Sequence, residues 1–239
     1  MIKRLLTATT ILLLACSCNS SSELKSWRDE NRLPNDVYRV EEVSVVNNPF
    51  GNDHKHTSRT VYSLDKLGRT EYVTTNSQRT DYYYAGKSLL LDSCVYSDGS
   101  KMIFKYSGDK CIELITVDRN GDVSSDVHVT SHTRKGLPID SSTDGWTTHM
   151  EYDNDGRMVS MSLSHNGEVY SKMIYEYNSH GDRISERETA PNALIDSSTN
   201  VDYDYDYEGD YWVTQRKYKV YDSGDRDLRL LTTRKIFRK

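Results

Sequence analysis

The sequence predicts an all-β protein, an extended antiparallel meander of repeated β-hairpins with one short N-terminal helix. From Val37 onward, apolar and aromatic residues alternate with polar ones, as at Met102, Phe104 and Tyr106. This period of two is typical of strands that bury one face and expose the other. Turn signals containing glycine recur about every eight to twelve residues, which favours hairpins. We expect about ten to thirteen strands, in a sheet that twists and curls or doubles over.

The first 15 residues have the features of a secretory leader. Lys3 and Arg4 give a positive start, and the apolar stretch that follows is too short to cross a bilayer as a permanent helix. Leu13-Leu14-Ala15-Cys16 then resembles a bacterial lipobox. The resemblance implies that the leader is cleaved before Cys16 and that the Cys16 thiol is diacylated. The alternative is a secreted protein that an ordinary signal peptidase cuts after Ala15.

A tether is expected between the leader and the sheet, over residues 16–36. Residues 17–22 are polar and small, which suits a linker. Residues 23–32 are expected to form the helix, because the preceding serines and Glu23 have capping-box spacing and Pro34 stops a helix. The chain then divides into a leader (1–15), a lipidated tether with a short helix (16–36) and a single β-repeat domain (37–239).

A short motif recurs along the predicted sheet: a tyrosine, a turn containing glycine, then a polar and an apolar residue. Tyr152-Asp153-Asn154-Asp155-Gly156-Arg157-Met158 is the fullest copy, and residues 177–184 form another. Looser copies begin at Tyr62, Tyr84, Tyr106, Tyr207 and Tyr221. At these residues, over about 61–237, the chain resembles the YD-repeat (RHS-repeat) family and its small bacterial envelope lipoproteins. The resemblance implies a sheet built from repeated hairpins, with too few copies to wind the cavity-enclosing shell of the large members.

A longer repeat overlies this motif. Ile139-Asp140-Ser141-Ser142-Thr143 recurs identically at residues 195–199, and a proline precedes each copy. The spacing corresponds to about two hairpins, so we expect the two copies to form loops at equivalent places in the sheet.

The most unusual stretch is Asp202-Tyr203-Asp204-Tyr205-Asp206-Tyr207-Glu208. Its tyrosines Tyr203, Tyr205 and Tyr207, with Trp212 beyond the turn, are the candidate ligand-facing residues, because aromatic rings with a polar tip suit stacking on sugars. Alternatively these tyrosines form the core, since the chain has 18 Tyr but only 3 Phe and 3 Trp. Calcium binding is a further alternative, although carboxylates along one strand diverge and do not easily converge on one ion.

No cofactor and no metal site are expected. The histidine pairs His54/His56 and His128/His132 each lack the three or four converging ligands that a metal site needs. We therefore interpret these four side chains as solvated histidines.

Two expectations concern positions within the sheet. Cys94 and Cys111 are expected on strands separated by one other strand, beyond disulfide reach, and so to be free thiols. The last strand is expected to be a solvated edge whose charges discourage sheet-to-sheet association. These charges are Arg229, Arg234, Lys235 and Arg238.

Composition and motifs predict a protein that is not an enzyme. The formal net charge of −5 gives no attraction to nucleic acid, and the sequence has no Gly-x-Ser-x-Gly, no His-Glu-x-x-His and no phosphate-binding glycine loop. We expect a non-catalytic binding or structural lipoprotein of the bacterial cell envelope, held at the outer membrane by its lipid, with a glycan or another envelope protein as partner. A carbohydrate-binding accessory lipoprotein is the alternative, and an envelope hydrolase is less supported. Glu23 is the single acid shortly after Cys16, which leaves the surface and the periplasmic side both open.

Replacing Cys16 with Ser is expected to remove acylation and to move the protein from the membrane fraction to the soluble fraction. The reason is that acyl chains, at about 0.8 kcal/mol per buried CH₂, would provide the membrane attachment. Metabolic labelling with a fatty acid measures the modification directly. Wild-type protein that takes up no label would contradict the lipobox interpretation.

Overall fold

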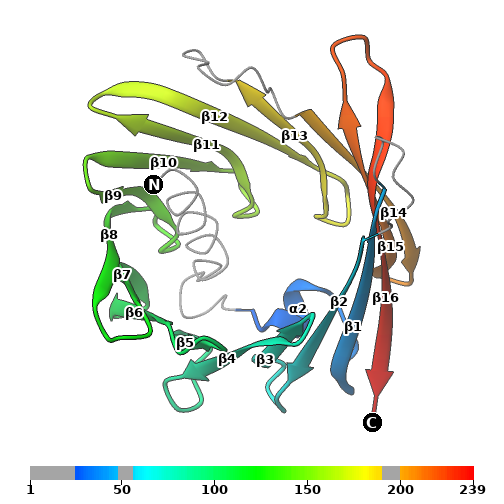
Figure 1. Cartoon of the computed structure of the whole chain (residues 1–239), viewed down its shortest axis with the longest axis horizontal. Helices are drawn as coiled ribbons and strands as arrows, with labels where there is room; N and C mark the ends of the chain where they lie inside the picture. Colours follow the sequence, from blue (N-terminus) through cyan, green and yellow to red (C-terminus); the bar gives the residue numbers. More distant parts are fainter. Residues whose placement is uncertain (1–24, 48–55, 190–199) are drawn as a thin grey trace. The chain divides into compact units, whose positions relative to one another are not determined.

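The computed structural model describes residues 25–47, 56–189 and 200–239. The leader, Cys16 and the rest of the tether up to residue 24, His54 and the second copy of the longer repeat lie outside the described residues. Within them, the regular structure is sixteen β-strands and one helix, α2 (Trp27–Glu30) (Figure 1). The helix is shorter than the expected span of residues 23–32, of which the first two are not described.

The chain divides into two compact units. The terminal unit comprises Trp27–Arg79 and Ser171–Lys239, and of the described residues the central unit comprises Thr80–Tyr170 with Lys25 and Ser26. Besides α2, the terminal unit contains β1 (Val37–Val46), β2 (His56–Leu64), β3 (Thr70–Thr75), β13 (Arg183–Thr189), β14 (Asn200–Glu208), β15 (Tyr211–Val220) and β16 (Arg226–Arg238).

The central unit contains β5 (Leu91–Tyr96), β6 (Lys101–Ser107), β7 (Lys110–Val117), β8 (Val123–His132), β9 (Pro138–Thr143), β10 (Trp146–Tyr152) and β11 (Met158–His165). Two strands, β4 (Gln78–Tyr84) and β12 (Glu168–Tyr177), run across the unit boundaries. The all-β prediction is therefore confirmed, and within the described residues one short helix precedes the first strand.

The strand order is that of a closed barrel, so the predicted extended open meander is wrong. Each strand neighbours the strands before and after it in the sequence, and β16 also pairs antiparallel with β1. In this pairing Val40 lies opposite Ile236 and Val43 lies opposite Thr233. Closure satisfies the backbone donors and acceptors that an open sheet leaves unpaired at its two edges. Hairpin signals act between neighbours in sequence, so they do not reveal that the first and last strands pair.

The same pairing corrects the prediction for the C-terminal strand. β16 hydrogen-bonds to β15 on one side and to β1 on the other, so it is not an edge. Its Arg234 is buried, with a relative exposure of 9%. The alternation along β16 places Arg234 on the same face as Thr232 and Ile236, which are buried or half-buried.

One turn geometry recurs at seven hairpins of the described residues. In each, the residue at position 1 donates its N–H to the carbonyl of position 5, and a glycine at position 4 donates back to the carbonyl of position 1. The glycine has a positive φ, 81° at Gly156 for example, which marks a type I turn followed by a bulge. The turns begin at Asp65, Tyr96, Asp118, Thr133, Asp153, Asn178 and Tyr221.

The copies of the sequence motif that begin at Tyr152 and Tyr62 add a side chain to this turn. Asp153 Oδ1 accepts from the backbone N–H groups of Asp155 (3.0 Å) and Arg157 (2.9 Å), and Asp153 Oδ2 accepts from Arg157 Nε (2.7 Å). Asp65 and Arg69 repeat the arrangement, with a 2.7 Å contact between Arg69 Nε and Asp65 Oδ2. The tyrosine-aspartate-glycine-arginine pattern thus encodes a self-capped turn.

The number of strands exceeds the expected ten to thirteen because some turns carry no strong glycine signal. Asn76 and Ser77 turn the chain between β3 and β4 with φ values of 47° and 75°, without glycine.

The first copy of the longer repeat does not form the loop that was expected, because Ile139 to Thr143 belong to strand β9. Serine and threonine in that copy pair with β8 and β10 rather than leaving the sheet.

The cysteine prediction is confirmed. Cys94 lies on β5 and Cys111 on β7, with β6 between them, and both are buried free thiols. Burial raises the pKa of the Cys94 thiol, as expected when charge is removed from water.

Replacing Gly156 or Gly167 with Val is expected to lower the free energy of unfolding by about 1–3 kcal/mol, because a β-branched residue suits positive φ poorly. The two glycines have φ values of 81° and 82°. A Cβ at Gly167 meets nothing within 4 Å, so its cost is conformational rather than steric crowding. Chemical denaturation measures the change, and Val169→Ile at a strand position that is 38% exposed is the near-silent control. Gly→Val variants that unfold like wild type would contradict the turn assignment.

Candidate functional site

The three candidate tyrosines lie in one row on the face of the terminal unit's sheet that contacts α2. Tyr205 lies opposite Gln215, and Gln215 lies opposite Thr232, so Tyr205 shares a face of the sheet with Gln215 and Thr232. Trp27 of α2 stacks on Tyr62 of β2 with ring centroids 4.7 Å apart, on the same face. Ring centroids are 6.5 Å apart for Tyr203 and Tyr205 and 6.0 Å apart for Tyr205 and Tyr207. The alternation in the sequence thus produces a continuous aromatic row.

Every hydroxyl in this row is used by the protein. The three phenols donate to β13 or to the turn before it: Tyr203 to Glu186 Oε1 (2.9 Å), Tyr205 to the Arg183 carbonyl (2.8 Å) and Tyr207 to Asp182 Oδ2 (2.7 Å). Burial, helped by the hydrogen bond to Asp182, raises the pKa of Tyr207 to about 12. Burial is also the main cause of the raised pKa values of Tyr203 and Tyr205. The row therefore consists of neutral phenols at any physiological pH.

Trp212 joins the row but one of its ring faces is covered. Its ring centroid is 6.2 Å from that of Tyr205, and the guanidinium carbon of Arg234 lies 3.4 Å above the indole. Trp212 is 9% exposed. Cation–π stacking and an ion pair with Glu42 (2.7 Å) compensate Arg234 for its burial. Burial still lowers the pKa of Arg234 below its usual value.

The segment after α2 is tied to the same face by two arginines. Arg234 Nη2 donates to Asn31 Oδ1 (3.2 Å). Arg32 pairs with Asp182 and donates to the carbonyls of His180 and Asp210. Arg32 has a φ of 54°, at the position where a helix C-terminus usually carries glycine. The three contacts to its guanidinium hold this residue in a conformation that side chains disfavour.

The geometry of the row serves the fold directly. His180 stacks on Tyr207 with ring centroids 4.2 Å apart, Arg234 covers Trp212, and each phenol is hydrogen-bonded. The row, which lies on β14 and β15, is thereby joined to β13, to the turn before β13 and to β16, as in the alternative in which the tyrosines are core. Binding of a sugar at Tyr203, Tyr205, Tyr207 and Trp212 stays a prediction.

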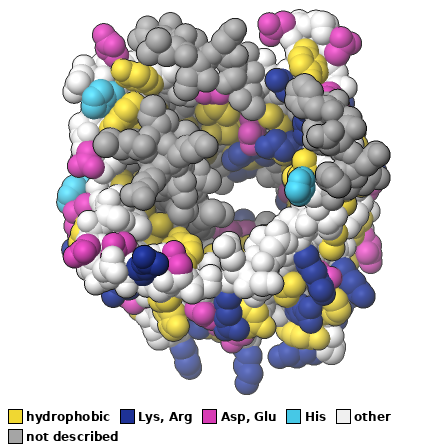
Figure 2. All heavy atoms as spheres, in the orientation of Figure 1, with side chains coloured by type: hydrophobic (Ala, Val, Ile, Leu, Met, Phe, Trp, Pro, Cys, Tyr) yellow, Lys and Arg dark blue, Asp and Glu magenta, His cyan; other side chains and the backbone are white. Residues whose placement is uncertain are grey.

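The three aspartates of the same strand lie on the opposite face, each with an arginine partner. Asp206 pairs with Arg216 (2.6 Å), Asp204 with Arg226 (3.0 Å) and Asp202 with Arg187 (2.5 Å). Figure 2 shows Lys and Arg side chains gathered where β1 and β16 lie. The carboxylates form a ladder of ion pairs rather than a convergent set of oxygens, which argues against the calcium alternative.

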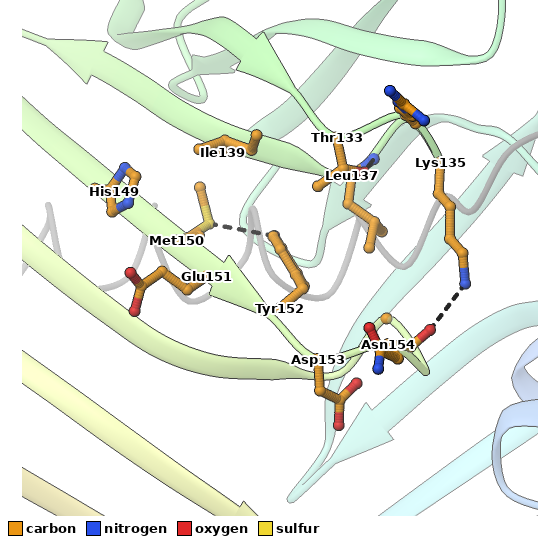
Figure 3. Close-up of a pocket in the computed structure, with 12 residues that line it drawn as sticks. Thr133, Lys135, Leu137, Ile139, His149, Met150, Glu151, Tyr152, Asp153 and Asn154 are labelled. Atoms are coloured by element: carbon orange, nitrogen blue, oxygen red, sulfur yellow. Dashed lines mark hydrogen bonds between the residues drawn. The ribbon is translucent and has the colours of Figure 1, made fainter.

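A hollow that the sequence did not predict lies in the central unit. It has a volume of about 440 Å³ and lies between the turn beginning at Thr133 and the turn beginning at Asp153 (Figure 3). Lys135 Nζ donates to the Asn154 carbonyl (3.0 Å) across it, and Tyr152 donates to the Pro138 carbonyl (2.8 Å). The sequence does contain the two glycine turns that border this hollow, but it does not indicate that a hollow lies between them.

No protein-family model matches this sequence, and no curated protein matches it. Among solved structures, a porin-like protein from Bacteroides uniformis ATCC 8492 has a TM-score of 0.43 at 11% identity, over 84% of this chain and 98% of that one. The Photorhabdus luminescens Tc holotoxin pore has a TM-score of 0.32 at 9% identity, over 78% of this chain and 14% of the toxin chain. Both scores are too low to place the chain in either group of proteins. Within the described residues, no helix is long and apolar enough to cross a membrane.

The ion pair between Arg234 and Glu42, which the sequence did not predict, can be tested by substitution. Arg234→Met is expected to lower the free energy of unfolding by about 3–5 kcal/mol, because it leaves the Glu42 carboxylate buried without its partner. Adding Glu42→Gln to Arg234→Met should restore part of the loss. Arg216→Met, which breaks an exposed pair on the opposite face, is the matched control and should change stability far less. Equal effects of the two single variants in chemical denaturation would contradict the assignment of Arg234 to the interior.

Proposed function

We propose that this chain is a non-catalytic lipoprotein of the bacterial cell envelope. In this proposal Cys16 carries the lipid anchor, and the β-repeat domain acts in water as a binding or structural module. The observation that supports it best is that both faces of the terminal unit's sheet carry charged side chains along the middle of the strands.

The face opposite α2 carries exposed ion pairs. Besides the three Asp–Arg pairs of β14, Glu41 of β1 pairs with Arg59 (2.7 Å) and Arg39 (3.3 Å). Charged side chains on a lipid-facing strand surface are unfavourable, and membrane-spanning barrels place an apolar band there. This face is therefore suited to water.

The face that contacts α2 is also polar, but its charges are paired and partly buried. Glu42 pairs with Arg234, Asp182 pairs with Arg32, and Arg183 pairs with Glu186 (2.7 Å). Among the described residues, both faces of this sheet carry charged side chains along the strands, whereas a membrane-spanning barrel needs apolar ones on its lipid face. A membrane location then has to come from the leader and Cys16, where about 0.8 kcal/mol per buried CH₂ makes several acyl chains a stable anchor.

A direct test is to purify the Cys16→Ser full chain without detergent. We expect a soluble protein with a β-sheet circular dichroism spectrum and a cooperative melt, because the sheet needs no lipid. Wild-type protein, by contrast, should require detergent for extraction. A Cys16→Ser chain that stays in the membrane and dissolves only in detergent would overturn the proposal in favour of an inserted barrel.

Carbohydrate binding at the tyrosine row is the second candidate, favoured by the continuity of the row over Tyr203, Tyr205 and Tyr207. A glycan array with the soluble Cys16→Ser chain tests it. The candidate requires a ligand whose binding is lost in Tyr203→Ala and kept in Asp204→Ala, a change on the opposite face of the same strand. Both variants should first be shown to melt cooperatively, and an array without any ligand would reject this candidate.

A further inference from the structure

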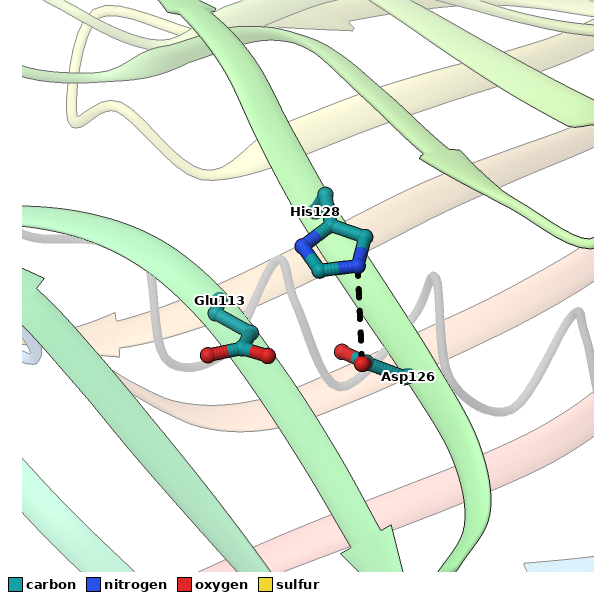
Figure 4. A group of neighbouring side chains, drawn as sticks. All are labelled: Glu113, Asp126 and His128. Atoms are coloured by element: carbon teal, nitrogen blue, oxygen red, sulfur yellow. Dashed lines mark ion pairs between the residues drawn. The ribbon is translucent and has the colours of Figure 1, made fainter.

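Three side chains with metal-binding donors meet on one face of β7 and β8 in the central unit. Glu113 lies directly opposite His128, and Asp126 lies two residues before His128 on the same strand face. One ligand atom from each residue lies within 4.8 Å of the other two. Figure 4 shows the two carboxylates and the imidazole pointing toward one another.

The imidazole and one of the carboxylates already have the spacing of two ligands of one metal ion. His128 Nε2 is 3.4 Å from Asp126 Oδ2. Two ligands at about 2.1 Å from a tetrahedral Zn²⁺ are about 3.4 Å apart. The Glu113 carboxylate has an oxygen within 4.8 Å of both of these ligand atoms, and a glutamate side chain can move toward a shared ion by rotating about its own bonds.

The charge balance of the cluster favours a cation. The cluster contains two carboxylates, those of Glu113 and Asp126. One ammonium group lies beside them, with Lys105 Nζ 2.6 Å from Glu113 Oε2. Asp126 Oδ1 is buried and has no hydrogen-bond partner, and a buried acceptor without a partner is costly.

We propose that Glu113, Asp126 and His128 form a binding site for a divalent transition-metal ion, with Zn²⁺ as the reference ion. One imidazole nitrogen with two carboxylate oxygens suits Zn²⁺, whereas Ca²⁺ and Mg²⁺ take oxygen ligands almost exclusively. Three protein ligands leave further coordination positions to water or to a donor from outside. His128 is 59% exposed, so the site is open to solvent.

Lys105 gives the proposal a distinctive signature. Its ammonium occupies one oxygen of Glu113 and repels an incoming cation, and it is 51% exposed. Removing this charge should therefore strengthen metal binding, whereas removing any of the three ligands should weaken it. A cluster that served the fold alone would not show this opposite response.

The test is calorimetric titration of the purified full chain with Zn²⁺, together with visible absorption of bound Co²⁺. His128→Ala, Asp126→Asn and Glu113→Gln should each weaken Zn²⁺ binding at least tenfold, and Lys105→Gln should strengthen it several-fold. His149→Ala is the matched control, because His149 also pairs with an aspartate, Asp140 (2.7 Å), but belongs to no three-ligand group among the described residues.

Two results would overturn the site: unchanged Zn²⁺ binding in His128→Ala, or an equal loss in His149→Ala. Weaker rather than stronger binding in Lys105→Gln would also count against it. Thermal melts in EDTA identify any variant that is unfolded, and the single amide replacements Asp126→Asn and Glu113→Gln preserve side-chain size. The measurement does not depend on whether Cys16 is acylated, so its outcome is separate from that of the proposed function.

Discussion

The backbone pairing of β16 with both β15 and β1 is the interaction on which the terminal unit depends. It joins the last strand of the chain to the first and leaves β16 without a free edge. Because β16 has a neighbouring strand on both sides and is not an edge strand, the side chains on its α2-facing side are buried or half-buried. Arg234 is the most demanding of them, since a guanidinium in the interior needs a counter-charge and hydrogen-bond acceptors.

The polar network on that face follows from this requirement. Glu42 of β1 supplies the counter-charge, Trp212 of β15 supplies a ring face, and Asn31 supplies an acceptor next to α2. The tyrosines of β14 continue the network toward β13 through their hydroxyls. The chain is poor in aliphatic residues, and its interior accordingly uses amphipathic side chains whose polar ends are hydrogen-bonded. This explains how a sequence with a mean hydropathy of −0.75 forms a sheet with a defined interior.

The candidate sites differ in how far local sequence could reveal them. The tyrosine row could be predicted, because Tyr203, Tyr205 and Tyr207 alternate within one strand and alternation alone puts them on one face. The cluster of Glu113, Asp126 and His128 could not, because its members come from two strands and become neighbours through the register of β7 against β8. The sequence places His128 beside His132 on one strand face, but His132 Nε2 contacts the Cys111 carbonyl (2.7 Å) instead. Register depends on turn geometry and on the side chains of both strands, which no motif within one strand contains.

The all-β class, the alternation of faces and the turns follow directly from the amino-acid sequence. Those features depend on interactions between residues a few positions apart, such as Asp153 with Gly156 and Arg157. The separation of Cys94 from Cys111 by one strand followed from the same local order. Three features are seen only in the folded protein: the closure of the sheet, the burial of the Arg234 side chain and the pairing of β16 with a strand on each side. These outcomes depend on β1 meeting β16 at the far end of the chain, and the side-chain pattern of either strand is equally compatible with a solvated edge.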